Sequence, residues 1–306
     1  MFPSPFRRLM SIEEAKRALE ENFHPTPVGT ELVPILHAYN RVLSRDIQAP
    51  IDVPPFHRST VDGYAVRAQD TFGAYEDHPI PLRVCGKVSV GETPQITVKS
   101  GEAAGIATGA PLPPGADAVV MLEYTVQKDD VVMVYRPVAV GENVMKAGSD
   151  IPKGETVLRK GQVLASREVG VLAALGFKEV EVYRQPRVAI LSTGAEVVEP
   201  GKPLTLGKIY DINQYSLSVA VMECGGTPIP VGILPDDEEA IRNALKEALA
   251  SSDVVITSGG VSVGPTDVMP RVLQSLGRPG VIVCGVASKP GKPTTIAIID
   301  GKPVFS

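Results

Sequence analysis

The chain has 306 residues, a length typical of roughly two domains. Apolar residues make up 43% of it and charged residues 21%, which excludes an intrinsically disordered chain. The formal net charge of −5 argues against nucleic-acid binding through a broad basic surface. No run approaches the roughly 18 apolar residues that a membrane span needs, so we expect no membrane contact.

The three cysteines, Cys85, Cys224 and Cys284, are far apart and form no Cys-x-x-Cys pair. This pattern disfavours a disulfide scaffold and a zinc site, and a reduced cytoplasmic setting fits it best. Asparagine and glutamine are scarce, which hints at a thermophilic source because both residues are thermolabile.

The first expected element is a helix that begins after Ser11. Ser11 and Glu14 can form a capping box, and apolar residues follow at helical spacing as far as Phe23. Pro25 and Pro27 then end the helix. A second short helix is expected over residues 36–42.

The sequence pattern of residues 50–147 is typical of a small all-β module. Short β-rich runs at 82–88, 118–123 and 131–135 are separated by glycine and proline. A helix over 166–175, with Ser166 as its N-cap, and a strand over 178–183 follow. We therefore expect the β module to be inserted into an N-terminal helical domain made of residues 1–49 and 148–185.

From residue 186 onward strands alternate with amphipathic helices. Expected helices cover 212–224, 238–250 and 267–276, with Asp236 as the cap of the second, and Asp300-Gly301 is typical of a hairpin turn. This alternation predicts a three-layer, doubly wound and mostly parallel sheet in residues 186–306. The expected fold class is therefore a multidomain α/β plus β protein. The expected strands are 187–191, 228–233, 253–257, 281–286, 294–299 and 303–305.

Small, hydroxyl and charged residues follow four of these strands, where ligands bind in open parallel sheets. Backbone amides beside small residues and two lysines suit an anion, and three carboxylates suit Mg²⁺ beside a phosphate. No P-loop and no Gly-x-Gly-x-x-Gly before a helix is present, so NTPase and NAD-binding sites are disfavoured. The candidates are Thr193, Gly194, Glu196, Asp236, Ser258, Gly259, Gly260, Ser262, Asp267, Lys289 and Lys292.

Each feature also has an ordinary structural interpretation. Ser258-Gly259-Gly260 can be a simple turn, Asp236 a plain helix cap, and the two lysines a solvated surface loop. The coincidence of all of them at one edge favours a site for a metal-bridged phosphate ester or anhydride.

Seven motifs in a fixed order carry a resemblance to a known family. On them the chain resembles the MoeA family of molybdopterin molybdenumtransferases, relatives of the gephyrin E domain and of its plant counterpart, from about residue 11 to the end. The motifs are Asp62-Gly63-Tyr64-Ala65, Thr108-Gly109-Ala110, Gly148-Ser149-Asp150-Ile151, Ser192-Thr193-Gly194, Tyr210-Asp211-x-Asn213, Ser258-Gly259-Gly260-Val261-Ser262-x-Gly264 and Lys289-Pro290-Gly291-Lys292-Pro293.

The resemblance implies a transferase of molybdenum cofactor biosynthesis, with a MoaB- or Mog-like molybdopterin-binding domain. Its substrates would be adenylylated molybdopterin and molybdate or tungstate, and Mg²⁺ would assist the release of AMP. Carried over by motif, Glu196, Asp236 and Asp267 would hold the metal and act with Asp62 as catalytic residues. Substrate would contact Thr108, Asp150, Thr193, Gly194, Ser258, Gly259, Gly260, Ser262, Lys289 and Lys292.

The family also implies an elongated homodimer in which the partner's β module completes the cleft, so that Asp62 and Thr108 act in trans. A molybdopterin adenylyltransferase is a candidate partner. A C-terminal β-barrel domain follows in the family, and we expect this chain to be truncated before it and to be inactive by itself. The alternatives are a molybdopterin adenylyltransferase, whose chains are short single domains, and a non-catalytic binding or scaffold module.

Overall fold

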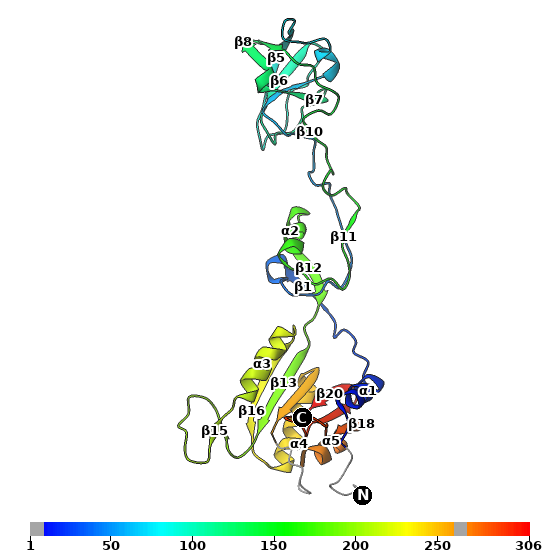
Figure 1. Ribbon diagram of the computed structural model, residues 1–306, viewed down its shortest axis with the longest axis vertical. Coiled ribbons are helices and arrows are strands. Elements are labelled where there is room, and N and C mark those ends of the chain that lie inside the picture. Colours follow the sequence, from blue (N-terminus) through cyan, green and yellow to red (C-terminus); the bar gives the residue numbers. More distant parts are fainter. Residues whose placement is uncertain (1–8, 260–267) are drawn as a thin grey trace. The chain divides into compact units, whose positions relative to one another are not determined.

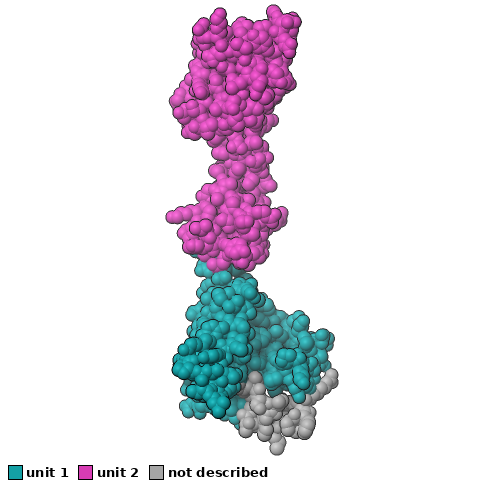
Figure 2. Space-filling view, turned by 60° about the vertical axis from the view of Figure 1, so that its left-hand side comes forward, with its two compact units in different colours: residues 1–32, 181–306 teal, residues 33–180 magenta. Residues whose placement is uncertain are grey.

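The computed structural model describes residues 9–259 and 268–306 (Figure 1). The chain divides into two compact units, one formed by residues 1–32 and 181–306 and the other by residues 33–180 (Figure 2). The two units are described separately below, starting with the unit that contains both ends of the chain.

The first unit is built on a six-stranded sheet with the order β16-β13-β17-β20-β19-β18. β13 pairs in parallel with β16 and β17, and β17 pairs in parallel with β20. β19 runs antiparallel to both of its neighbours, so the other five strands end at the same edge. The strands are β13 (Arg187–Thr193), β16 (Thr227–Leu234), β17 (Val254–Ser258), β18 (Pro279–Cys284), β19 (Thr295–Ile299) and β20 (Lys302–Phe305).

Helices cover both faces of this sheet (Figure 1). α3 (Asn213–Glu223) packs against Val188 and Ile190 on one face. α4 (Glu238–Ser251) and α5 (Val268–Leu276) pack against Ala189 and Leu191 on the other. Successive residues of β13 are therefore buried on opposite faces, as in a strand with helices on both sides. The doubly wound pattern expected from the sequence is present, in a mixed sheet.

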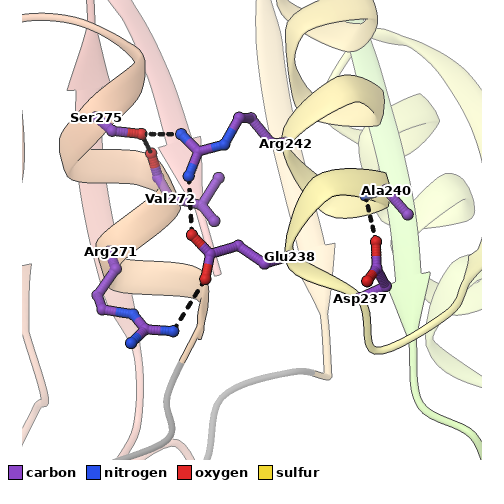
Figure 3. A network of polar contacts seen from close by, with 7 residues as sticks. All are labelled: Asp237, Glu238, Ala240, Arg242, Arg271, Val272 and Ser275. Carbon is purple, nitrogen blue, oxygen red and sulfur yellow. Dashed lines mark hydrogen bonds and ion pairs between the residues drawn. The ribbon is translucent and has the colours of Figure 1, made fainter.

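A polar network ties α4 to α5 (Figure 3). The two carboxylate oxygens of Glu238 each accept from an arginine, at 2.9 Å from Arg242 and 3.0 Å from Arg271. Arg242 also donates to the hydroxyl of Ser275 on α5. These groups are partly exposed, so the network contributes modestly to stability and mainly fixes how the two helices meet.

α1 (Ile12–Asn22) belongs to the sheet unit. Its capping box is present, with Ser11 and Glu14 bonded reciprocally, and Ala15 packs with Val283 and Ile296. The unit division therefore does not follow the domain boundaries expected from the sequence, which placed this helix with residues 148–185.

The second unit holds a six-stranded sheet with the order β7-β4-β6-β5-β9-β8. Buried side chains, mainly valine and alanine, form one hydrophobic cluster on each face of this sheet, so that short strands still build a packed core. This sheet lies within the β module expected at 50–147. Its strands are β4 (Gly63–Val66), β5 (Ile80–Val88), β6 (Glu102–Ile106), β7 (Ala118–Met121), β8 (Thr125–Lys128) and β9 (Val131–Val134).

Smaller elements complete the chain. The short paired strands are β1 (Thr30–Pro34) with β12 (Glu179–Tyr183), β2 (Ile47–Gln48) with β11 (Thr156–Leu158), β3 (Arg58–Ser59) with β10 (Val144–Met145), and β14 (Val197–Val198) with β15 (Ile209–Tyr210). The short helices are α2 (Ser166–Ala174) and the 3-10 turns η1 (Ile35–His37), η2 (Ala68–Thr71) and η3 (Leu122–Tyr124). In the described part of the chain no helix has the length and apolar character that crossing a membrane requires.

Three local expectations are wrong. Residues 36–42 form no α-helix; the 3-10 turn Ile35–His37 gives way to a segment whose amides bond to distant carbonyls, with Asn40 donating to Leu164. α2 is capped at Ala165, not Ser166, since Glu168 accepts from the Ala165 N–H. α4 is capped by Asp237, not Asp236.

Candidate functional site

A cavity of about 170 Å³ opens at the carboxyl ends of β13 and β17. From β13 the chain passes through α3 to β16 on one side, whereas from β17 it passes through α5 to β18 on the other. Adjacent strands whose connections diverge in this way leave a crevice between their ends, where ligands bind in open α/β sheets. The lining residues are Ser192, Thr193, Glu196, Val197, Ile209, Tyr210, Asp211, Ile212, Asn213, Ser258 and Gly259.

Two glycines shape the loops at this edge, and one of them lets two loops approach each other closely. At Gly259 the φ angle is +89°, and a Cβ there would lie 2.1 Å from the Thr193 carbonyl oxygen. At Gly194 the φ angle is +139°, and a Cβ would lie 2.9 Å from a carboxylate oxygen of Glu196. At Gly259 only glycine satisfies both the left-handed backbone and the close approach to a backbone atom, whereas at Gly194 the backbone angle alone favours glycine, since the Glu196 side chain can move.

Buried polar oxygens without a partner gather around the cavity. Buried polar groups are nearly always hydrogen-bonded, so such a group of atoms points to a bound molecule or to water. Among the described residues, unpartnered oxygens at this edge are carried by Ser192, Thr193, Asp211, Gln214 and Thr257.

The segment leading into α3 is held by side chains of the site. Asp211 is 5% exposed, and its Oδ1 accepts from the Gln214 N–H at 3.0 Å. Asn213 donates through Nδ2 to the Ser258 hydroxyl at 2.6 Å, which joins the start of α3 to the end of β17. Two neighbouring walls of the cavity are thereby fixed to each other.

Two of the three predicted metal-binding carboxylates lie on adjoining loops. Asp236 accepts from the Ala195 N–H at 3.2 Å, next to Glu196, and both carboxylates are exposed. Asp267 lies outside the described residues. Within residues 9–259 and 268–306 no group of three or more His, Cys, Asp or Glu side chains is placed to hold a metal ion. The described residues thus offer two hard oxygen donors to a magnesium ion.

The predicted lysines lie on the same edge of the sheet but outside the cavity lining. Lys289 and Lys292 are exposed on the loop after β18, with β20 and β19 between that strand and β17. Gly260 and Ser262 lie outside the described residues. The structure thus brings together Thr193, Gly194, Glu196, Ser258 and Gly259, with Asp236 bonded beside them.

Three predicted site residues belong to the second unit. Asp62 Oδ1 accepts from the Thr108 N–H at 2.9 Å, so these two share one turn region. The Asp150 N–H donates to the Val53 carbonyl at 3.0 Å, and the Asp150 side chain is exposed.

The residues with perturbed pKa values, among those described, belong to the second unit and do not line the cavity. The pKa of Glu102 is lowered, first by the backbone N–H of Lys99 and then by Arg83, and that of Glu168 is lowered by backbone N–H groups. Burial raises the pKa of the Cys85 thiol. These pKa shifts arise from local hydrogen bonds, an ion pair and burial, and they do not mark the candidate site.

Comparison with known families accounts for nearly the whole chain. Residues 10–176 match the family described as MoeA N-terminal region (domain I and II). This chain belongs to the MoeA family. Residues 189–306, which contain the cavity, match a second family described as "Probable molybdopterin binding domain".

Curated relatives bear the name molybdopterin molybdenumtransferase. The chain is 38% identical over 274 residues to the one from Nostoc sp., covering 90% of this chain and 63% of that protein. It is 38% identical over 286 residues to the one from Haemophilus influenzae, covering 93% and 69%. A solved structure of a molybdopterin biosynthesis MoeA protein from Pyrococcus horikosii superposes with a TM-score of 0.86 at 44% identity, covering 97% of this chain and 74% of that one.

Sequence reasoning missed the polar wall contributed by the start of α3. Asp211 and Asn213 line the cavity, but they were not among the predicted site residues. Their signal was the motif Tyr210-Asp211-x-Asn213, which was used for the resemblance but was not read as part of the site, and which spans the start of α3.

Proposed function

We propose that the chain acts in the insertion of molybdate or tungstate into adenylylated molybdopterin, with Mg²⁺ and with release of AMP. The observation that carries the proposal is the cavity at the diverging ends of β13 and β17, lined by hydroxyls and backbone of a molybdopterin-binding family. The names of the relatives supply the substrate class.

The residues have distinct roles in this proposal. Thr193, Gly194, Ser258 and Gly259 bind the molybdopterin, because their hydroxyls and close-packed backbone suit an anionic ligand. Lys289 and Lys292, on the same edge, attract the second anion. In the proposed reaction a water oxygen bonds to one phosphorus of the anhydride, the P–O bond to the bridging oxygen breaks, and the products are AMP and the phosphate monoester of molybdopterin, with the water's protons going to the phosphates and solvent. The two dithiolene thiols then form Mo–S bonds as two molybdate oxygens leave as water with the thiol protons and protons from solvent.

Glu196, Asp236 and Asp267 would hold the magnesium ion. When bound, the metal would polarise the phosphate. Glu196 and Asp236 have no ion pair with a described lysine or arginine, so their charge is available to a cation. From the second unit, Asp62, Thr108 and Asp150 would contact substrate.

We further propose that the protein is a homodimer whose cleft is completed by the partner's β module. Support comes from α3, which buries Leu217 and Val221 against the sheet. A helix with apolar residues on both faces normally has a cover on both. Its outer face, together with the residue before the helix, carries a second apolar stripe at spacings of three, four and three residues, with each side chain half or more exposed: Ile212, Tyr215, Val219 and Met222.

The activity is tested by incubating the full-length protein, including the expected C-terminal domain, with adenylylated molybdopterin, Mg²⁺ and molybdate and measuring AMP by chromatography. We expect AMP release that falls at least tenfold in Glu196→Gln. Glu199→Gln is the matched control, since Glu199 pairs with Lys202 in the same exposed loop and does not line the cavity. Binding of molybdopterin without any AMP release would support a non-catalytic binding module instead.

The dimer is tested by light scattering, which gives the mass in solution directly. Twice the mass of the chain is expected. A stable monomer at micromolar concentration would contradict the homodimer and the completion of the cleft by a partner, and would leave the substrate assignment unaffected.

A further inference from the structure

Asp211 places a buried carboxylate in the wall of the cavity. The residue is 5% exposed and lines the cavity wall. Oδ1 accepts from the Gln214 N–H, whereas Oδ2 has no partner among the described residues. A buried carboxylate oxygen without a donor is costly, so this atom calls for a hydrogen-bond donor or a cation from the ligand.

The neighbours of Asp211 favour an organic donor group. The other carboxylate in the cavity lining, Glu196, is exposed, whereas Asp211 is buried, and no group of three or more His, Cys, Asp or Glu in the described part of the chain is placed to hold a metal around Asp211. Hydroxyls lie close instead, because Ser192 and Ser258 are register partners on one face of the sheet. Ser258 accepts from Asn213 and therefore keeps its own O–H free to donate.

We infer that Asp211 and Ser258 recognise the 2-amino-4-oxopyrimidine edge of the pterin. This edge presents an amino group and a ring N–H beside a carbonyl oxygen. Oδ2 of Asp211 accepts from the amino group, and the Ser258 hydroxyl donates to the carbonyl. At about 170 Å³ the cavity is smaller than the roughly 300–1,000 Å³ of drug-sized ligand sites, so it takes a ring system and leaves the remainder of the substrate outside. The inference rests on the proposed function, since the pterin is part of that substrate.

Two commercially available ring systems test the assignment. Pterin carries the 2-amino group, and lumazine has a carbonyl in its place with nearly the same shape. Binding of each to the protein is followed by the fluorescence of the ring. The wild-type protein is expected to bind pterin roughly tenfold or more tightly than lumazine, because lumazine sets a carbonyl oxygen against the carboxylate.

The variant Asp211→Asn should remove most of this preference, because it loses the acceptor for the pterin amino group and relieves the repulsion of the lumazine carbonyl. Asp253→Asn is the control, since Asp253 accepts from the Arg187 N–H at the start of β13, at the opposite edge of the sheet. Equal binding of the two rings by the wild-type protein, or no binding of either, overturns the inference without any variant. Retention of the wild-type preference by a folded Asp211→Asn protein overturns it as well.

The outcome is separable from that of the proposed function. If AMP is released but pterin is not preferred, the reaction stands and the assignment of Asp211 falls. If pterin is preferred and lost in Asp211→Asn but no AMP is released, the recognition stands and the enzymatic proposal falls.

Discussion

Replacing Gly259 by alanine should damage both the stability of the sheet unit and its cavity. With φ at +89°, a non-glycine residue costs about 1–2 kcal/mol for the backbone conformation alone. The new Cβ would also lie 2.1 Å from the Thr193 carbonyl oxygen, a backbone atom that cannot rotate away. The shifts needed to accommodate this methyl group cost a further ~1–3 kcal/mol. We therefore expect the free energy of unfolding to fall by roughly 2–5 kcal/mol in total.

Gly201→Ala is the matched control, because Gly201 has a φ of +88° with nothing within 4 Å of a Cβ. Thermal unfolding measures both variants, and we expect Gly259→Ala to have the lower Tm by several degrees, at about 2–4 °C per kcal/mol. Pterin binding should weaken in Gly259→Ala and not in Gly201→Ala. Equal Tm values in the two variants would refute the close approach of the loops.

Two further predictions concern groups that do not line the cavity. Asp237→Ala should destabilise the sheet unit by about 0.5–2 kcal/mol in chemical denaturation, because the Asp237 side chain caps α4; an unchanged midpoint would contradict this capping role. Glu102 has a lowered pKa, chiefly through the Lys99 N–H and then Arg83, so its stabilising effect is present above the ordinary glutamate pKa and is lost as pH falls through the folded-state value. The Tm difference between the wild type and Glu102→Gln should therefore shrink on acidification, and a difference independent of pH would contradict the ion pair.

Local chemistry made much of the fold predictable. The capping box of Ser11 and Glu14 gave the start of α1, and Asp300-Gly301 gave the final hairpin, where both residues adopt positive φ. The sequence alternation predicted the helices on both faces of the sheet. Residues 36–42 could not be assigned this way, because Asn40 and Leu43 bond to Leu164 and Gln162, far along the chain.

The candidate site was predictable only as an edge of the sheet. The rule that ligands bind beyond parallel strand ends placed Thr193, Glu196 and Ser258 together, as found. The rule could not say which strand ends are neighbours, because the order of strands in the sheet is set by pairing between residues far apart in the sequence. For that reason Lys289 was expected beside the cavity but lies beyond two further strands, and Asp211 was overlooked.

The packing of α1 also shows a limit of sequence reasoning. Its apolar face is plain from spacing, but spacing does not say which surface it covers. The structure pairs Ala15 with Val283 and Ile296, more than 260 positions away, which moves the helix into the sheet unit.

A crystal structure of the protein with molybdopterin bound tests the central claim most directly. The account predicts electron density for the pterin ring between the ends of β13 and β17, within hydrogen-bond distance of Asp211 Oδ2 and the Ser258 hydroxyl. Density for the ring at any other surface, with that cavity left to solvent, would contradict it.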